Sequence, residues 1–395
     1  MHAPGSALPE ILVAGVGLTP IGEHWEKSLR SIALEAMTAA VEDAGGLRPQ
    51  ALFVGNMLAP ALSAQTHLGV LLADFAGWRG IEAATYEAAG ASGGIALRQA
   101  VLALASGEMD RVMVVGVEKL TDRIGSSVEA ALAAAADADF EAVQGLTPAA
   151  QAGLLMRRYI HEHHVPEHGF AGFSLTAHAN AVGNPRALYR RAIRLEDYAS
   201  APMLSDPLNL FDAAPVADGA AAILLTRGDR HRPAGERTPI RILASAVATG
   251  PLALHDQPDP LGFEAALISA GRAMAQAGMA ARDIDLFELH DVFSIYAALA
   301  LESAGFAERG QGWRLAAEGE ISRTGRIPIS TLGGSKARGD AGGATGVYQA
   351  VEVVLQLQGR AGEAQVPEAQ VGMGQCLGGA GATVATHILA RADRL

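Results

Sequence analysis

Residues 90–101 read Gly-Ala-Ser-Gly-Gly-Ile-Ala-Leu-Arg-Gln-Ala-Val, and residues 340–351 read Asp-Ala-Gly-Gly-Ala-Thr-Gly-Val-Tyr-Gln-Ala-Val. The shared Gln-Ala-Val sets an offset of 250 residues (349 − 99 = 250), which pairs Gly90 with Asp340. In each segment a glycine-rich turn precedes an apolar helix, an arrangement that directs backbone N–H groups at a bound oxyanion or phosphate. The repeat predicts a duplicated α/β domain with one composite site between its halves.

The flanking sequence predicts the same order of elements in each half. Short runs rich in β-branched residues and glycine predict buried strands at 11–17, 51–56, 111–117, 220–225, 285–290 and 383–389. Amphipathic helices that end at glycine are expected at 29–44 and 264–278. Aligning Phe53 with Phe287 (287 − 53 = 234) places Asn56 opposite His290. Residues 371–382 are interpreted as a glycine-rich reversal before the last strand.

The length and composition of the chain restrict the class of protein. A chain of 395 residues is long enough for two core units. Its net charge of −12 argues against nucleic acid or an anionic membrane surface as the main partner. Cys376 is the single cysteine, so no intramolecular disulfide can form. A chain with one cysteine fits a reducing compartment, no apolar run has the length of a membrane span, and the first residues lack the charge pattern of a signal peptide, so we expect a soluble, cytoplasmic protein.

An irregular, histidine-rich stretch interrupts the first half. We interpret residues 121–204 as an inserted loop domain, mostly helical, that covers the site. The N-terminal half then comprises residues 1–120 and 205–228, and the C-terminal half residues 236–395. Residues 227–238 resemble an exposed linker between the halves.

Five ordered motifs resemble the thiolase superfamily, in particular the sterol-carrier-protein-X-type and archaeal acetoacetyl-CoA thiolases. The motifs are Glu87–Gly94, Ser205–Ala222, Glu288–Phe293, Lys336–Gly346 and Gln375–Thr383. The resemblance implies an α/β thiolase fold of five layers, α/β/α/β/α, with a loop domain over the active site. It also implies coenzyme A thioester substrates, no bound cofactor, and a homodimer or tetramer joined near the strand before Gly90.

Two positions depart from the family pattern. Thiolases have a nucleophilic cysteine where this chain has Gly90, and the histidine of a Gly-His-Pro motif where it has Asp340. Glycine has no side chain, so no acyl-enzyme can form at residue 90. Ser92 is a candidate substitute nucleophile, although the family pattern already has a serine beside the cysteine.

The other half of the family site is retained. His290 matches a residue that donates to a thioester oxygen, and Cys376 matches one that moves a proton on and off the substrate carbon. The N–H groups of Gly90 and Gly378 match the second oxyanion hole. Such a site can stabilise an enolate, which suits carbon–carbon bond cleavage or formation on an acyl-CoA. Some family members without the cysteine are aldolases that work with a small zinc-ribbon/OB-fold partner.

Several residues have alternative interpretations. Asp340 is either a helix N-cap or a carboxylate that acts as a base or orients His290. Cys376 is either catalytic or a small buried hydrophobic residue. No metal site is predicted, because residues 161–164 (His-Glu-His-His) lack the His-Glu-x-x-His spacing.

Substrate contacts are expected from two groups of residues. His178 and Asn180 resemble a loop-domain motif that borders the acyl pocket. Either Arg157 with Arg158, or Lys336 with Arg338, could contact the phosphates of coenzyme A.

Three functions remain open at this point. The first is an aldolase-like enzyme of acyl-CoA or lipid metabolism. The second is a non-catalytic subunit that supports a partner enzyme, and the third is an acyltransferase with another nucleophile. For the enzyme, we expect Gly90 and Asp340 at helix N-termini, facing each other across a cavity that also contains His290 and Cys376.

Overall fold

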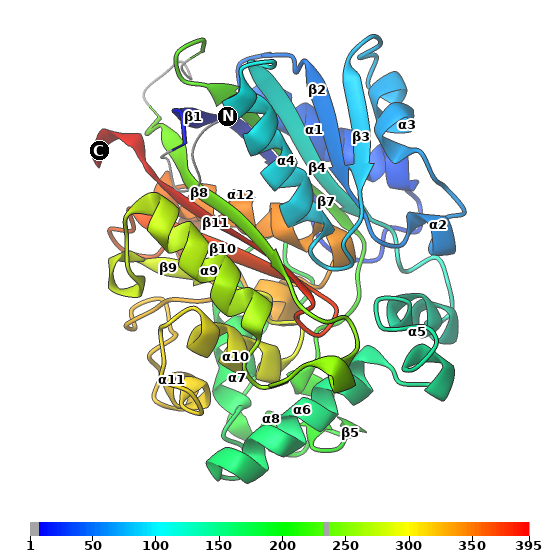
Figure 1. Ribbon diagram of the computed structural model, residues 1–395, viewed down its shortest axis with the longest axis vertical. Coiled ribbons are helices and arrows are strands. Elements are labelled where there is room, and N and C mark those ends of the chain that lie inside the picture. Colours follow the sequence, from blue (N-terminus) through cyan, green and yellow to red (C-terminus); the bar gives the residue numbers. More distant parts are fainter. Residues whose placement is uncertain (1–7, 232–236, 395) are drawn as a thin grey trace.

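The computed structural model describes residues 8–231 and 237–394 (Figure 1). The strands are β1 (Ile11–Leu18), β2 (Ala51–Gly55), β3 (Glu82–Tyr86), β4 (Arg111–Glu118), β5 (Met203–Ser205), β6 (Leu208–Asn209), β7 (Gly219–Arg227), β8 (Ile240–Thr249), β9 (Leu286–Glu288), β10 (Val371–Gly378) and β11 (Thr383–Arg391). The α-helices are α1 (Leu29–Asp43), α2 (Ala59–Leu62), α3 (Leu68–Phe75), α4 (Ser92–Ser106), α5 (Gly125–Ala133), α6 (Pro148–His163), α7 (Ala171–Ala181), α8 (Leu195–Ala199), α9 (Glu264–Ala277), α10 (Ser294–Ser303), α11 (Gly312–Ala317) and α12 (Thr345–Leu357).

A mixed sheet of nine strands contains both halves of the duplication. Its order is β3-β2-β4-β7-β1-β8-β11-β10-β9, so the second half repeats the first in mirror order about the β1–β8 junction. The expected alignment of Phe53 with Phe287 is confirmed by the pairing. Phe53 pairs in parallel with Ala84 of β3, and Phe287 makes a parallel bridge to Ile329, which occupies the place of β3 in the second half.

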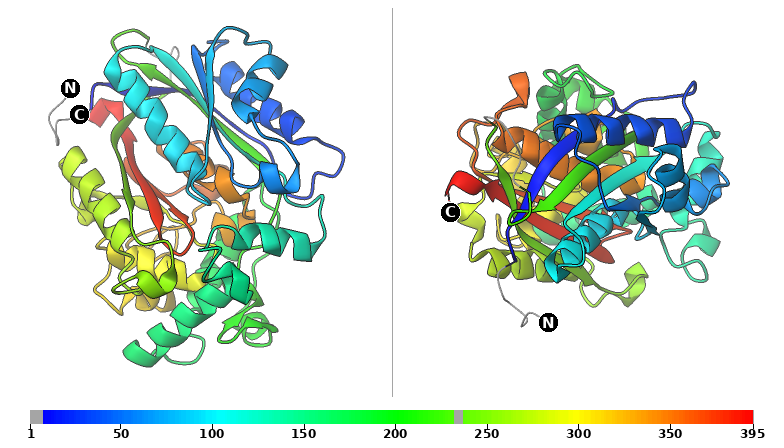
Figure 2. Two further views of the ribbon diagram at one scale, coloured as in Figure 1. Left: turned by 45° about the vertical axis from the view of Figure 1, so that its right-hand side comes forward. Right: turned by 90° about the horizontal axis from the view of Figure 1, so that it is seen from above.

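Helices α4 and α12 lie between the two halves of the sheet and form the central layer (Figure 2). Helices α1 and α3 pack on the outer face of the first half, and α9 and α10 pack on that of the second. Every residue of α12 is buried, as expected for a helix enclosed on all sides. These layers give the five-layer α/β/α/β/α architecture that the resemblance implies.

The structure corrects two element assignments. Residues 371–378 form the full strand β10, so the glycine-rich reversal is limited to residues 379–382. The helix of the second repeat begins at Thr345, later than the 250-residue offset predicts, because Gly342–Ala344 forms a 3₁₀ turn first. Strand β8 was not predicted. Of the expected linker, residues 232–236 lie outside the described residues.

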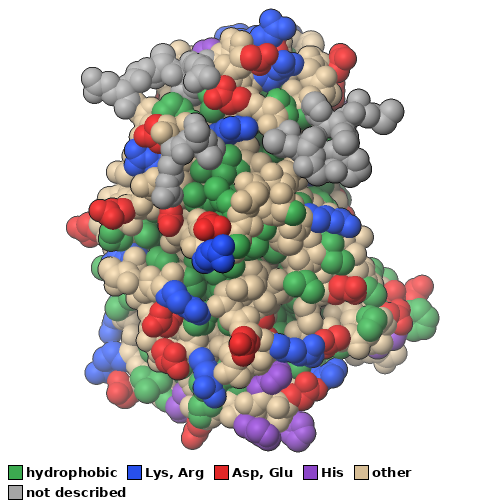
Figure 3. Space-filling view, turned by 60° about the vertical axis from the view of Figure 1, so that its left-hand side comes forward, with side chains coloured by type: hydrophobic (Ala, Val, Ile, Leu, Met, Phe, Trp, Pro, Cys, Tyr) green, Lys and Arg blue, Asp and Glu red, His purple; other side chains and the backbone are tan. Residues whose placement is uncertain are grey.

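Helices α5 to α8 and the β5–β6 hairpin lie between β4 and β7 in the chain; α6 to α8 and the hairpin are at the lower end of Figure 1, and α5 is at its right-hand side, below α2. This agrees with a mostly helical insertion, while the exact domain boundaries remain a prediction. None of the helices among the described residues is long and apolar enough to cross a membrane. On the face drawn in Figure 3, acidic and basic side chains are interspersed.

Candidate functional site

One cavity, of about 140 Å³, is lined by residues from all five sequence motifs. Gly90, His290 and Asp340 all line it, and residues of α5 and α6 form its cover. Cys376 is not among the lining residues, so the expectation that four motif residues share one cavity is wrong for the cysteine. The cavity is therefore lined by two candidate oxyanion donors, Gly90 and His290, and by two carboxyl-bearing residues, Asp340 and the exposed Glu129, without the thiol.

The turn that holds Gly90 connects β3 to α4. Ala89 has a left-handed backbone conformation with φ of 51°, a strained state of the kind found at functional sites. The hydroxyl of Ser92 donates to Ala89 O (2.6 Å) and accepts from Ala88 N (2.9 Å). Ser92 thus stabilises this turn with its hydroxyl, which makes it a poor substitute nucleophile. Within residues 8–231 and 237–394 the Gly90 N–H donates to no protein acceptor, so it is available to a ligand.

The structure leaves no room for a side chain at residue 90. A Cβ atom there would lie 2.6 Å from the carbonyl oxygen of Leu377 and 3.0 Å from Cε1 of His290. The nearer atom belongs to the backbone of β10 and cannot move as a flexible side chain would. The site has therefore lost both the nucleophile and the space for it.

We predict that Gly90→Cys produces no thiolase activity and lowers the melting temperature. Relieving the contact with Leu377 O requires movement of β10, and overpacking of this kind costs about 1–3 kcal/mol. Thermal unfolding and a thiolysis assay of Gly90→Cys, alone and combined with Asp340→His, would measure both effects. A well-folded double variant with strong thiolysis would contradict this prediction.

His290 follows β9 and presents a neutral imidazole to the cavity. Burial, with a smaller effect of the positive charge on Arg338, lowers the pKa of His290 to about 3. Its Nδ1 atom is buried and has no partner among the described residues. A buried lone pair is less costly than a buried unpaired N–H, so we assign the proton to Nε2. That atom would lie 3.3 Å from a Cβ on Gly90, so the two donors of the cavity are neighbours.

Asp340 precedes α12 and opens partly to the cavity. Burial raises the pKa of Asp340 to about 6. The hydrogen bond from Thr345 and the positive charge of Arg338 act in the opposite direction and lower it. The Thr345 hydroxyl donates to Oδ1 at 2.8 Å. The N-cap positions of the 3₁₀ turn and of α12 are Ala341 and Ala344, so the helix-capping alternative for Asp340 is wrong.

Glu118, at the end of β4, fixes the turn that follows Asp340. Its Oε2 atom accepts from Met57 N (2.9 Å) and Gly343 N (3.0 Å), and Asn56 donates to Oε1. Burial raises the pKa of Glu118 to about 7, and the charge of Asp340 adds to this rise. Sequence reasoning missed this residue, although a glutamate that ends a buried strand was a usable signal.

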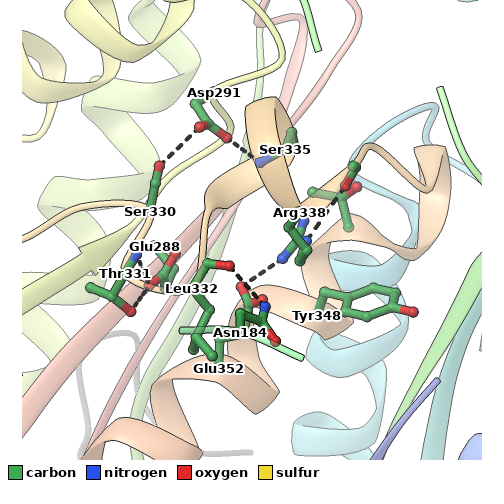
Figure 4. Close-up of polar contacts among 12 residues, drawn as sticks. Asn184, Glu288, Asp291, Ser330, Thr331, Leu332, Ser335, Arg338, Tyr348 and Glu352 are labelled. Carbon is green, nitrogen blue, oxygen red and sulfur yellow. Dashed lines mark hydrogen bonds and ion pairs between the residues drawn. The ribbon is translucent and has the colours of Figure 1, made fainter. Parts of the chain in front are cut away.

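A second network holds the π-helical turn Gly334–Arg338, which precedes Asp340 (Figure 4). Asp291 accepts from Ser330 Oγ (2.9 Å) and Ser335 N (2.7 Å). Arg338 forms a buried ion pair with Glu352 at 2.6 Å. Its guanidinium also lies over the ring of Tyr348. The predicted contact of Arg338 with coenzyme A phosphates is therefore corrected, because its charge is already paired inside the protein.

Cys376 occupies a separate buried cluster with Ala91 and Ala385. Burial raises the pKa of the Cys376 thiol to about 12, which keeps it protonated and unreactive near neutral pH. This environment fits the interpretation as a small buried hydrophobic residue. Gly378 is buried against Ala88 O, and Gly379 is the residue that lines the cavity.

The four predicted substrate-binding residues are divided by the structure. His178 and Lys336 line a second cavity, next to the first. Asn180 instead donates to the carbonyl oxygens of Ile329 and Ser330, a structural role that corrects its assignment to the acyl pocket. The exposed Arg157 and Arg158 pair with Asp206 and Glu162.

Among the described residues, no group of three or more His, Cys, Asp or Glu side chains could hold a metal ion.

A duplicated α/β sheet with a composite cavity between its two glycine-rich turns defines a thiolase-type protein. The family models for the thiolase N-terminal domain and the thiolase C-terminal domain-like region match residues 11–229 and 246–391, so the chain belongs to the thiolase superfamily.

Three similar proteins represent its relatives. An acetyl-CoA acetyltransferase of Methanothermobacter thermautotrophicus is 42% identical over 97% of this chain and 100% of that protein. The 17-hydroxy-3-oxo-4-pregnene-20-carboxyl-CoA lyase of Mycobacterium tuberculosis is 29% identical over 88% of this chain and 91% of that protein. The solved structure of the Ltp2-ChsH2(DUF35) aldolase superposes with a TM-score of 0.82 at 25% identity, covering 99% of this chain and 100% of that chain.

Proposed function

We propose that this protein is an acyl-CoA enzyme that breaks or forms a carbon–carbon bond by aldol chemistry, without an acyl-enzyme. The observation that carries the proposal is the cavity itself. It combines two oxyanion donors, Gly90 N–H and His290 Nε2–H, with the Asp340 carboxyl group and has no space for a nucleophile at residue 90. The similarity to a CoA lyase and to an aldolase supports the same reaction class.

The chemistry follows from the positions of these groups. In the cleavage direction, Asp340 takes the proton of the β-hydroxyl group, and the bond between Cα and Cβ breaks. A carbonyl compound leaves, and the electron pair becomes a thioester enolate. His290 and Gly90 donate hydrogen bonds to the enolate oxygen, where negative charge develops in the transition state. Asp340 then returns the proton to Cα, which yields the shorter acyl-CoA.

We expect the cleavage rate to rise with pH through about 6 and then remain level. Only the ionised carboxylate of Asp340 accepts the proton, and its pKa is about 6. His290, with a pKa of about 3, stays neutral above this range and contributes no further change. The measurement is kcat/KM from about pH 5 to about pH 8, which reports the ionisation of the free enzyme. A rate that falls as pH rises through 6 would assign the opposite protonation state to the active enzyme.

The direct test compares two reactions. Purified protein, with and without partner proteins from the native host, is incubated with β-hydroxyacyl-CoA thioesters that are branched at Cβ. We expect a carbonyl compound and a shorter acyl-CoA, and negligible thiolysis of acetoacetyl-CoA. Efficient thiolysis, with an acyl adduct on the protein, would reject the proposal.

Acyl transfer with another nucleophile is the second candidate, favoured by the 42% identity to an acetyl-CoA acetyltransferase. The chain's own candidates are poorly suited to it. The Cys376 thiol does not line the cavity, and the Ser92 hydroxyl is engaged within its own turn. Mass spectrometry after incubation with acetyl-CoA distinguishes the two proposals, because only acyl transfer through a side chain leaves a covalent acyl group.

The assembly is also part of the proposal. The similarity to the Ltp2-ChsH2(DUF35) aldolase supports a small partner protein, consistent with the zinc-ribbon/OB-fold partner that the resemblance implies. Strand β3 lies at the edge of the sheet and is partly exposed, which supports a homodimer or tetramer joined at this edge.

A further inference from the structure

The cavity that contains Lys336 is a larger neighbour of the catalytic cavity. Its volume is about 330 Å³, and it shares the wall residues Leu204, Ala213 and Ala214 with the catalytic cavity. One molecule could therefore occupy both cavities. The lining includes Lys336 and Arg191 and contains no Asp or Glu, so its charged residues are all positive.

Lys336 is a buried cation without an ion pair among the described residues. Only 2% of it is exposed, and its Nζ atom donates to the backbone carbonyl oxygens of Asp212 (2.7 Å) and Phe211 (3.4 Å). The carboxyl group of Asp212 is turned to other donors, Tyr198 Oη and Asn209 N. Buried ammonium groups are costly unless they are paired, so a bound anion would complete this site.

Apolar and aromatic side chains form the rest of the wall. The ring of His178 stacks on Tyr189 and meets the edge of Phe211. Burial lowers the pKa of His178, and the positive charge of Lys336 contributes to this lowering, which favours the neutral form of the ring. A carboxylate on an apolar scaffold matches this combination better than the strongly hydrated phosphates of coenzyme A. The pantetheine arm also keeps those phosphates far from the thioester.

We propose that this cavity binds the acyl part of the substrate and that Lys336 pairs with a carboxylate at its far end. The substrate class is then an acyl-CoA with a second, free carboxylate. This inference rests on the proposed function for the location of the thioester, but its test requires no turnover.

The test measures binding of matched thioester pairs by calorimetry. Succinyl-, glutaryl-, adipoyl- and suberoyl-CoA are compared with butyryl-, pentanoyl-, hexanoyl- and octanoyl-CoA, and free coenzyme A is measured as well. At the length that fits, we expect the carboxylate to bind about 10- to 100-fold more tightly, as for a charge-assisted hydrogen bond. Lys336→Met should abolish this preference and leave the affinity for free coenzyme A unchanged. Lys27→Met, at a partly exposed lysine that pairs with Glu35, is the control for surface charge.

Two outcomes would overturn the inference. One is equal affinity for the two thioesters of every pair. The other is that Lys336→Met loses as much affinity for free coenzyme A as for the carboxylate thioester, which would mean that the lysine binds a phosphate of coenzyme A.

If Lys336→Met does not fold, the wild-type protein still provides a test. Burial lowers the pKa of Lys336 to about 8, although the negative charges of Asp212 and Asp291 act to raise it. The ammonium group is charged below that pH, so the preference for the carboxylate thioester should persist there and decline at higher pH. A preference independent of pH would also overturn the inference.

A failed cleavage assay leaves these binding results intact. The proposed function and the carboxylate site can therefore fail independently of each other.

Discussion

Asp340→Asn is expected to reduce the rate of carbon–carbon bond cleavage by about 10²–10⁴-fold, the usual contribution of a general base. Asparagine has nearly the same shape and can still accept the hydrogen bond from Thr345, but it cannot take the β-hydroxyl proton. Single-turnover measurements with a saturating β-hydroxyacyl-CoA would isolate this chemical step.

The stability of the same variant separates a chemical effect from a structural one. The folded pKa of Asp340, about 6, exceeds the ordinary aspartate value of 3.8, so folding stability decreases as pH rises between these values. The amide carries no charge and avoids this loss. We therefore expect the melting temperature of Asp340→Asn near neutral pH to equal or exceed that of the wild type. A large fall in melting temperature together with the fall in rate would point to a structural role.

Thr345→Val provides a matched control. The Thr345 hydroxyl lowers the pKa of Asp340 by donating to its carboxylate, and valine keeps the shape without the donor. The rising limb of the pH profile should therefore shift to higher pH, while the maximal rate changes little. No shift in this variant would indicate that another group controls the profile.

His290→Ala is expected to lower the cleavage rate by about 10²–10³-fold, as is typical when one oxyanion donor is removed. The enolate would retain the Gly90 N–H but lose the neighbouring Nε2–H donor. Because the donor stabilises a charge that develops in the transition state, the loss should appear in kcat more than in KM. Steady-state kinetics over a range of substrate concentrations would show this division.

His387→Gln is the matched control for this change. His387 is also buried, with a pKa lowered to about 4 by burial, but its Nε2 atom contacts Gly94 O and it does not line the cavity. Its substitution should leave kcat near the wild-type value. Equal losses in both variants would indicate a general effect of removing a buried histidine rather than the loss of an oxyanion donor.

The absence of an acyl-enzyme at residue 90 was predictable from the sequence because it depends on the identity of single residues. Gly90 and Asp340 stand where the family has a cysteine and a histidine, and reading two positions is enough to exclude the acyl-enzyme. The offset that aligns Phe53 with Phe287 also predicted that the two strands are equivalent, and their parallel pairings agree with this. A repeat of this kind can be recognised from the order of residues along the chain alone.

The role of Cys376 was not predictable in the same way. Successive side chains of a strand point to opposite faces, so a motif match cannot say which of two neighbours reaches the cavity. In β10 that residue is Leu377, whose carbonyl oxygen also closes the space beside Gly90, while Cys376 points into a buried cluster. A difference of one residue in a strand reverses the assignment.

The sequence by itself determined the duplicated α/β fold, the family, and the motifs that would meet at one site. Only the tertiary structure decided which charges remain free to act. Arg338 is paired with Glu352, whereas Lys336, two residues earlier, lines a cavity without an ion pair among the described residues. Glu118 acquires its role from Met57 and Gly343, which lie far from it in the chain. Local patterns encode elements and motifs, but the partners of a buried charge come from distant segments that meet only when the chain folds.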